Sequence, residues 1–485
     1  MEKTKKLTLL YLLLLTTVLP LYMKDGFYKL GEAKGVLFMA LGGVFFVVSA
    51  VLMLISKTPF KLGLMGVLLF SNIITFLLSI DKKTALLGLD GWRMGLLSLL
   101  FSIFSACIIS NGIEFKKIFV IAILIVPFAV CILGILGRFG IYPLGVSADD
   151  GSFLSTIGNI NWFTAFLSVF VPLGGSIAAT RKRFSLEFFL SEIIVIVGLL
   201  SLLLQGSESG LLIIAGTYLL LLFLGLSDRE TFKAFLIQLF TLGIAMAIVY
   251  LLMFFFGKRY TYDDNLLILI CQNHSGIILM AAVFFIYRLS RFAEEVNLEW
   301  KEKLYKKIFY VMILIGVAVV SVLLYKTYSD DFGNGRGIIW RMSFDMYKSL
   351  SPIRKIVGVG QDCFYKYAYS DPSWSESFIN VFGGNRLTNA HNMYLTLLIE
   401  GGVMGLISFI FTFGYVLKNL IMIKDTDKKK HAGLCCALPI FVYLINGLVS
   451  FSTVVSTPYV FMILGYGLYV IKDDSEEITQ DRERE

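Results

Sequence analysis

The sequence predicts an all-α protein, a polytopic membrane bundle of about 12–14 transmembrane helices with one large extracytoplasmic loop. Hydrophobic residues make up 57% of the 485-residue chain and charged residues only 16%, whereas soluble proteins have about 45–50% and about 25%. Apolar segments of about 20 residues, the length that crosses a bilayer as a helix, recur along the chain. The basic residues gather in short connectors between these segments.

About fourteen segments meet this criterion, with an uncertainty of about two. They are expected near 7–23, 35–55, 62–80, 93–111, 118–137, 161–179, 187–204, 209–226, 235–256, 265–286, 308–325, 392–417, 433–450 and 457–471. The chain therefore divides into N-terminal transmembrane helices (1–325), an extracytoplasmic loop (326–391), C-terminal transmembrane helices (392–471) and a tail (472–485).

Lys and Arg accumulate on the cytoplasmic side of membrane proteins. Every second connector of this chain is basic, for example Lys3–Lys6, Arg181–Arg183, Arg229 with Lys233, and the 288–307 connector. This alternation predicts that both termini are cytoplasmic and that the 326–391 loop lies outside. It also explains the net charge of +8 without a nucleic-acid partner.

Six cysteines are present, and none follows a spacing typical of a metal site or a disulfide framework. We therefore expect no metal site and no cofactor.

Within the loop, Gly335-Arg336-Gly337 opens a helical pattern. Trp340, Phe344 and Tyr347 form one stripe of the expected helix, and charged residues form another, which predicts an amphipathic helix on the bundle or the lipid interface. An arginine fork at a helix N-terminus suits phosphate or pyrophosphate. The alternative is an ordinary surface arginine near a helix start.

His391 is one of only three histidines. Thr388 or Asn389 is the expected N-cap of the following helix, which would place His391 in the first helical turn, where the macrodipole keeps the imidazole neutral. A neutral imidazole can accept a proton. The alternative is a histidine that only forms hydrogen bonds at the membrane interface. His274, near mid-membrane or at a broken helix start, is the other histidine to consider.

Further along the same segment, Glu400 is expected to be buried, and so either neutral or paired with a basic residue. Gly401 and Gly405 form a pair that lets a neighbouring helix approach closely.

Polar residues also mark the N-terminal half. Asn159 and Asn161 precede the 161–179 segment, and Gln205–Gly210 forms a polar turn that contains Glu208. A simple hairpin tip is the alternative for this turn.

Three motifs carry a resemblance to a known family. They are Gly335-Arg336-x-x-x-Trp340, Gly358-Val-Gly360-x-x-x-Phe364 and Ala390-His391-Asn392-x-x-Leu395-x-x-Leu398-x-Glu400-x-Gly402-x-x-Gly405. In this order the region from about Gly333 to Gly405 resembles the O-antigen ligase and O-antigen polymerase family of bacterial membrane glycosyltransferases. Asn159-Ile-Asn161 extends the resemblance more weakly toward the N-terminus.

The resemblance implies a glycosyltransferase fold of the C type, working without a metal on the outer face of the bacterial cytoplasmic membrane. The implied donor is a glycan on undecaprenyl pyrophosphate, and the acceptor is another glycan, a lipid or a cell-wall polymer. The protein would then be a polysaccharide polymerase or a glycan ligase.

The resemblance also implies roles for particular residues. Arg336 would hold the pyrophosphate, and His391 would contact it or activate the acceptor hydroxyl. The chain departs from the family at Glu208, where many members have an arginine, so another basic residue must replace that contact or Glu208 acts as an acid or base. The expected substrate-binding residues are Arg341, Arg386, Asn389, Asn392, Asn159, Asn161, Glu208 and Arg93, with Arg259 as a further replacement arginine.

Two other classes of function compete with the enzyme. About fourteen helices with intramembrane polar residues would suit a flippase for lipid-linked oligosaccharides, although no internal repeat typical of transporters is visible. A scaffold for a polysaccharide assembly complex would have no need of His391 or Arg336.

Overall fold

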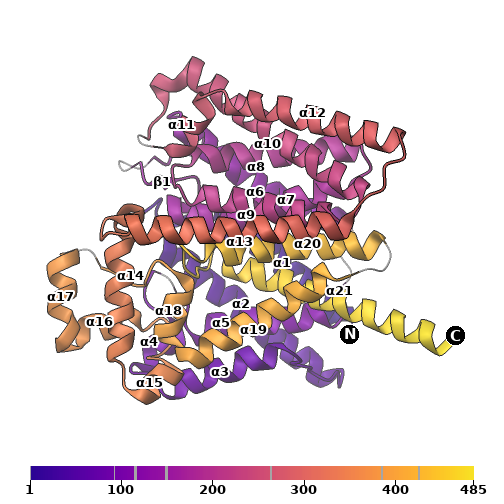
Figure 1. Ribbon diagram of the computed structural model, residues 1–485. Coiled ribbons are helices and arrows are strands. Elements are labelled where there is room, and N and C mark those ends of the chain that lie inside the picture. The colour runs from indigo at the N-terminus through magenta and orange to yellow at the C-terminus, as the bar shows by residue number, and fades with distance from the viewer. Residues whose placement is uncertain are drawn as a thin grey trace. The chain divides into compact units, whose positions relative to one another are not determined.

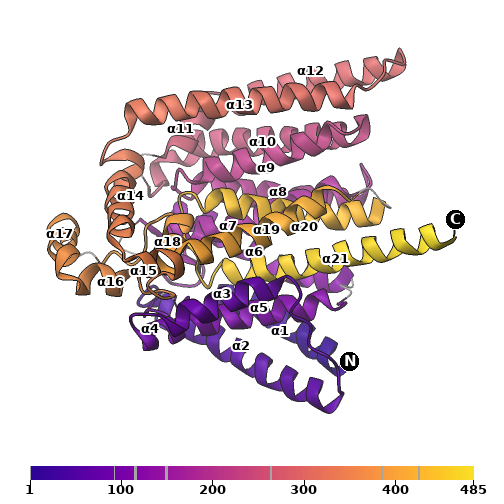
Figure 2. The ribbon, with the colours of Figure 1, turned by 60° about the horizontal axis from the view of Figure 1, so that its bottom comes forward.

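A computed structural model describes residues 2–91, 93–113, 117–147, 151–262, 265–383, 386–423 and 427–484, and these are helical almost throughout (Figures 1 and 2). The chain forms two compact units. The first unit comprises residues 1–127, 330–440 and 446–485, and the second comprises residues 128–329 and 441–445.

The first unit contains two groups of helices that are distant in the sequence. Its helices are α1 (Glu2–Leu21), α2 (Leu30–Ile55), α3 (Met65–Leu77), α4 (Lys82–Leu87), α5 (Leu96–Ser110), α14 (Phe332–Ser349), α15 (Pro352–Val357), α16 (Phe364–Ser370), α17 (Pro372–Phe382), α18 (Met393–Glu400), α19 (Gly402–Ile421), most of α20 (Asp427–Asn446) and α21 (Thr457–Arg484). Helix α6 (Lys117–Arg138) begins here and continues into the second unit. The two groups interlock, because α21 packs on α5 and α19 packs on α3.

The second unit is a bundle centred on its longest helix, α10 (Arg229–Phe256), which contacts α7, α8, α9 and α12. Its elements are β1 (Phe153–Leu154), β2 (Gly158–Asn159), α7 (Ile160–Ala179), α8 (Leu186–Leu204), α9 (Gly210–Gly225), α10, the 3-10 helix η1 (Gly257–Arg259), α11 (Leu266–Gln272), α12 (Ser275–Glu295) and α13 (Glu302–Thr327). The strands pair antiparallel, Phe153 with Asn159 and Leu154 with Gly158.

All fourteen predicted apolar segments fall on helices. Among the described residues, nine helices are long and apolar enough to cross a membrane, and three apolar helices, α3, α5 and α9, are shorter. The nine are Glu2–Leu21, Leu30–Ile55, Phe119–Arg138, Ile160–Ala179, Leu186–Leu204, Arg229–Arg259, Ser275–Glu295, Glu302–Thr327 and Gly402–Ile421. The protein is a multi-pass helical membrane protein.

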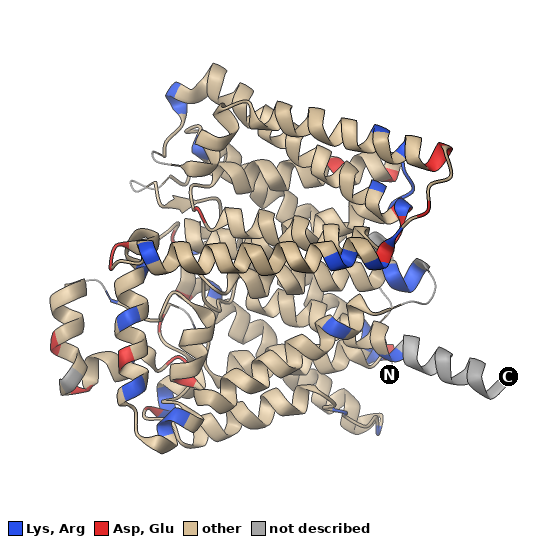
Figure 3. Cartoon of the chain, in the orientation of Figure 1, with Lys and Arg blue, Asp and Glu red and all other residues tan. Residues whose placement is uncertain are grey.

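Charged residues of the second unit gather at the ends of its helices, and long central stretches carry none (Figure 3). The start of α10 and the end of α12 lie at the same end, because Lys233 Nζ lies 2.6 Å from a carboxylate oxygen of Glu294. The guanidinium of Arg229 lies over the ring of Trp300 in the next connector. Two basic connectors predicted for one side therefore lie together.

The predicted outer loop folds on a hydrophobic core of its own within the first unit. Buried side chains from α14, α16, α17 and the start of α18 meet there: Met342, Met346, Leu350, Val359, Cys363, Phe364, Ala368, Phe378, Leu387, Ala390 and Ile399, with Ala85 from α4. In the first unit these loop helices lie at the opposite end from both chain termini (Figures 1 and 2).

Two segments predicted as single helices are each broken in two. The 265–286 segment divides into α11 and α12 at Asn273 and His274, and His274 has a left-handed φ of 59°. The 392–417 segment divides into α18 and α19 at Gly401, followed by Gly402 with φ of +64°. Hydrophobicity alone does not reveal either break, since apolar residues continue on both sides.

Candidate active site

The segment that carries His391 precedes α18. The prediction that Thr388 or Asn389 caps this helix is wrong, because the Asn392 side chain accepts the N–H of Leu395 at 3.0 Å and is the N-cap. His391 therefore lies outside the helix, with a left-handed φ of 47°. The Asn389 side chain instead accepts the backbone N–H of His391 at 2.8 Å. This short polar turn sets the direction of the imidazole.

The loop after α20 fixes the same segment from the other side. Met393 N donates to Gly447 O at 2.8 Å, and Asn392 Nδ2 donates to Leu448 O at 2.9 Å. Phe451, slightly further on, presents its ring edge-on to His391 with centroids 5.4 Å apart. His391 is therefore held in one place by contacts to its own turn and to the loop after α20.

The imidazole of His391 is neutral at physiological pH, as predicted, but the main cause is burial rather than a helix dipole. Burial, followed by the positive charge of Arg336, lowers the pKa of His391 from 6.5 to about 4. The structure thus brings Arg336 and His391, 55 positions apart in the sequence, into electrostatic contact.

Arg336 stands at the start of the regular part of α14. Gly333, Asn334 and Gly335 before it all have left-handed backbone angles, so continuous helical geometry begins only after them. The Arg336 side chain turns back and donates from Nη1 to Gly333 O at 3.0 Å. In the predicted apolar stripe of α14, Phe344 is 50% exposed, whereas Met342 and Met346, which lie outside this stripe, are buried in the loop core.

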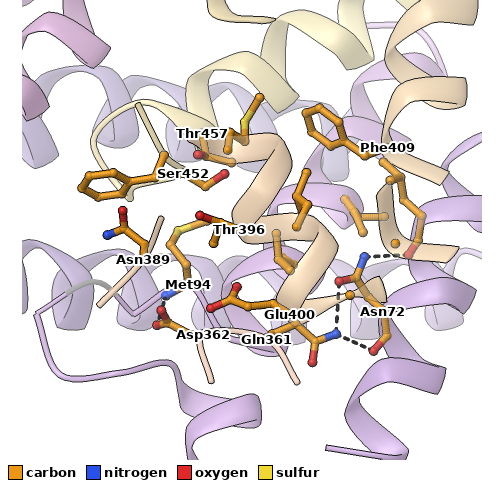
Figure 4. A pocket seen from close by; sticks show the side chains of 18 of the residues that line it. Asn72, Met94, Gln361, Asp362, Asn389, Thr396, Glu400, Phe409, Ser452 and Thr457 are labelled. Carbon is orange, nitrogen blue, oxygen red and sulfur yellow. Dashed lines mark hydrogen bonds between the residues drawn. The ribbon is translucent and has the colours of Figure 1, made fainter. Parts of the chain in front are cut away.

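A cavity of about 90 Å³ lies within the first unit, beside the His391 turn (Figure 4). Its walls come from α3, α5, α18, α19, α21 and the loops at residues 94, 361–362, 389 and 451–452. The lining residues are Leu68, Asn72, Met94, Leu99, Ile103, Gln361, Asp362, Asn389, Met393, Thr396, Leu397, Glu400, Gly401, Gly405, Phe409, Phe451, Ser452, Thr457 and Phe461.

Two carboxyl groups, Asp362 and Glu400, lie together at this cavity (Figure 4). Asp362 Oδ2 accepts the N–H groups of Leu89 at 2.6 Å and Met94 at 3.1 Å, and Glu400 Oε1 accepts the N–H of Phe364 at 3.2 Å. Burial raises the pKa of Asp362 to about 6. Burial, together with the charge of Asp362, also raises the pKa of Glu400. Glu400 is the last residue of α18, just before the α19 span.

These shifts favour a neutral carboxyl at Glu400, one of the two forms predicted for it, and no ion pair of Glu400 occurs among the described residues. Asp362 was not predicted as a site residue. The Gly358-Val-Gly360 turn that precedes it was the available signal, since Gly360 N donates to Glu400 O at 2.9 Å and so brings the next two residues to the end of α18.

The other predicted substrate-binding residues of the first unit mostly have partners already. Arg341 forms an exposed, two-bonded ion pair with Asp330, with Nη2 to Oδ2 at 2.6 Å. Arg93 pairs with Glu32 and, at 2.9 Å, with Asp90. The guanidinium of Arg386 lies 4.1 Å from the ring centroid of Tyr365. Of the asparagines, Asn389 lines the cavity and Asn392 caps α18.

Three predicted residues belong to the second unit. Asn159 caps α7 and accepts the N–H of Asn161 at 2.9 Å. The side-chain oxygen Oδ1 of Asn161 accepts a hydrogen bond from Ser207 Oγ at 3.3 Å, so the Asn-x-Asn motif contacts the predicted polar turn. Glu208 is exposed in this turn between the buried Ser207 and Ser209. Arg259 ends the 3-10 helix η1.

Among the described residues, no group of three or more His, Cys, Asp or Glu side chains is arranged to hold a metal ion.

Comparison with known proteins gives one family. Residues 193–410 match the model of the O-antigen ligase family, a span that runs from α8 into α19 and includes both Arg336 and His391. No curated protein matches the chain. The family consists of enzymes that ligate or polymerise glycans, with a lipid-linked glycan as donor and a second molecule as acceptor. Over residues 193–410, the chain is similar to the O-antigen ligase family.

Proposed function

We propose that this protein transfers a glycan from undecaprenyl pyrophosphate to an acceptor hydroxyl on the outer face of a bacterial cytoplasmic membrane. The observation that carries the proposal is the meeting of Arg336, at the start of α14, with the buried imidazole of His391. Both residues fall inside the segment that matches the family. In this proposal both chain termini face the cytoplasm.

Arg336 is proposed to hold the pyrophosphate. When the bond between the anomeric carbon and the phosphate oxygen breaks, negative charge accumulates on the leaving pyrophosphate, and a fixed cation aimed at it lowers the barrier. A guanidinium stays charged at any physiological pH and presents several N–H donors to phosphate oxygens.

His391 is proposed to receive the proton of the acceptor. The acceptor oxygen attacks the anomeric carbon, the pyrophosphate leaves with the bonding electrons, and the hydroxyl proton passes to the imidazole. The depressed pKa of His391 keeps the ring free to accept throughout the physiological range. Its position in a rigid turn, fixed by Asn389 and Phe451, supports this directed role.

The acceptor decides between two versions of the reaction. A second lipid-linked glycan would make the protein a polysaccharide polymerase, and a lipid or cell-wall polymer would make it a glycan ligase. We propose Arg341, Arg386, Asn389, Asn392, Asn159, Asn161, Glu208 and Arg93 as residues that contact the donor or the acceptor.

The decisive experiment uses purified full-length protein in detergent, incubated with the lipid-linked repeat unit of its own host. Wild type is compared with Arg336→Ala and His391→Ala, and products are separated on a gel. A ladder of glycan lipids that both substitutions abolish identifies a polymerase. Release of undecaprenyl pyrophosphate only after another acceptor is added identifies a ligase.

Correct folding of each variant is checked by its elution profile and its thermal unfolding. If wild type leaves the donor unchanged with every acceptor, yet moves it across a vesicle bilayer, the transferase proposal is refuted and the protein is a flippase. If the variants turn over as fast as wild type, the proposed site is wrong.

A further inference from the structure

We propose that the cavity lined by Asp362 and Glu400 binds one sugar ring of the substrate glycan and thereby selects which sugar is joined. The inference rests on the proposed function for the identity of the substrate. Binding of a sugar to the cavity can nevertheless be measured without any transfer reaction.

The cavity has room for such a ligand. Its volume is about 90 Å³, whereas a single water needs about 10–15 Å³ measured in the same way. A side chain added at Gly405, which lines the cavity, would meet only the Leu397 carbonyl oxygen, 3.9 Å away. The space is therefore not closed by tight packing around it.

Polar side chains of the cavity retain hydrogen-bonding capacity. Asp362, 7% exposed, accepts two backbone N–H groups through Oδ2. Glu400 accepts backbone N–H groups of Phe364 and Asp362. Buried acceptors without donors are costly, and sugar hydroxyls are donors. Gln361, 5% exposed, also lines the cavity and leaves its Oε1 without a partner.

The remaining walls suit the other faces of a sugar. Apolar side chains, among them Met94, Phe409 and Phe451, also line the cavity. A pyranose has hydroxyls around its edge and C–H groups on its faces, so it can contact both kinds of wall at once. A bare cation would gain nothing from the apolar walls and requires about six oxygen ligands.

The cavity is connected to the proposed catalytic residue by two shared neighbours. Asn389 lines the cavity and accepts the backbone N–H of His391, and Phe451 lines the cavity and contacts the imidazole ring. A sugar held there has its edge next to His391, where a hydroxyl or an anomeric carbon must react. The donor and the acceptor both carry sugars, and the experiment below distinguishes them.

The test measures binding of short oligosaccharides, released by mild acid from the host's own surface polysaccharide, to full-length protein in nanodiscs. Saturation-transfer NMR reports the contact. Asp362→Asn and Glu400→Gln replace an acceptor oxygen by an N–H₂ donor without changing shape, and Gly405→Val fills the cavity. Gly414→Val is the matched control, because a side chain at Gly414 on the same helix meets nothing within 4 Å and lies outside the cavity lining.

We expect the three cavity variants to weaken oligosaccharide binding about tenfold or more, while Gly414→Val binds as wild type. Turnover then separates the substrates, because a raised KM for the acceptor alone assigns the cavity to the acceptor, and a raised KM for the donor alone assigns it to the donor. Absence of binding by wild type, or wild-type binding by all three cavity variants, overturns the inference. If the protein transfers no glycan but still binds sugar in the cavity, the proposed function fails and the sugar site stands.

Discussion

Two histidines of this protein share one local conformation and differ in their surroundings. His274 in the second unit and His391 in the first both have left-handed φ angles, 59° and 47°. His274 directly precedes α12, and His391 lies two residues before the first residue of α18. Each ring also lies next to an aromatic ring, that of Tyr250 at 4.7 Å and that of Phe451 at 5.4 Å.

The surroundings separate them. His274 is exposed, whereas His391 is largely covered and feels the charge of Arg336. Only the His391 turn shares neighbours with the polar cavity. A histidine at a helix break is therefore a weak indication of a site by itself. Arg336 and the cavity beside His391 are what distinguish it as a candidate.

The sharpest test of this comparison replaces each histidine by alanine. We expect His391→Ala to lower the rate of glycan transfer by about 10²–10⁴-fold, the range for loss of a general base. His274→Ala should keep most of the wild-type rate, because its ring is exposed and lies outside the cavity lining. Activity is measured as turnover of the lipid-linked donor. If the two variants lose activity equally, the proposed difference in role between His391 and His274 is refuted.

Removing the cation that distinguishes His391 should have the next largest effect. Arg336→Ala is expected to lower turnover by about 10²–10³-fold, since an electrostatic contact to the leaving group is lost. Lys348→Ala, whose charge is already paired with Asp345 on the surface of the same helix, is the matched control and should lose much less. Equal losses would show that general positive charge of the loop, rather than the position of Arg336, drives the reaction.

The helix break after His391 should be sensitive to a single methyl group. Gly402→Ala places a Cβ 2.2 Å from the carbonyl oxygen of Ile356, at a φ of +64° that disfavours alanine. We expect a loss of at least about 2 kcal/mol in the free energy of unfolding. Gly405→Ala, three positions on, meets nothing closer than 3.9 Å and should unfold like wild type in a thermal melt.

The pH dependence of turnover should be small over the physiological range. Because the pKa of His391 is about 4, the ring is already neutral at pH 5 and stays neutral at pH 8. The rate should therefore fall only as the pH approaches 4. The pKa of Asp362 at the neighbouring cavity is about 6, so the profile is also recorded for Asp362→Asn. An inflection near 6.5 that persists in this variant would mean that the pKa of His391 is not lowered.

The smallest expected effect concerns the carboxyl pair. The pKa of Glu400 is higher in the folded than in the unfolded state, so folded protein binds more protons above pH 4.5 and stability falls as the pH rises through that range. Glu400→Gln removes this term. Its melting temperature should decline less than that of wild type between pH 6 and pH 9, and an identical decline would contradict burial of an ionisable group at this position.

Much of the fold was predictable because a membrane imposes length and apolarity on each crossing helix. All fourteen segments fall on helices, and the polar Gln205–Gly210 turn separates α8 from α9 as expected. A broken helix at His274 was one of two predicted alternatives, and the structure has this break. The break at Gly401 and Gly402 was not predicted, because hydrogen bonds from a distant segment accompany it: Val359 N donates to Ile399 O at 3.0 Å.

The site shows the same division. The glycines before Arg336 predicted the helix start correctly, since left-handed backbone favours glycine. The N-cap of α18 was misplaced by three or four residues, because three neighbouring positions, Thr388, Asn389 and Asn392, all carry capping side chains. Asp362 could not be ranked above other acidic residues, since its importance follows from the cavity that distant helices form around it.

The backbone hydrogen bonds between the Gly358–Gly360 turn and the end of α18 have a practical consequence for protein engineering. Ile356 O lies against Gly402, Val359 and Gly360 donate to Ile399 and Glu400, and Thr75 Oγ1 donates to Val357 O at 3.0 Å, so residues 356–360 are anchored on two sides. Helix α17 packs mainly on α16 and buries Phe378 in the loop core, whereas its Ile379 and Val381 are exposed. An epitope tag for electron microscopy should thus be engineered by substitutions on the exposed face of α17, which leave Phe378 and residues 356–360 unchanged.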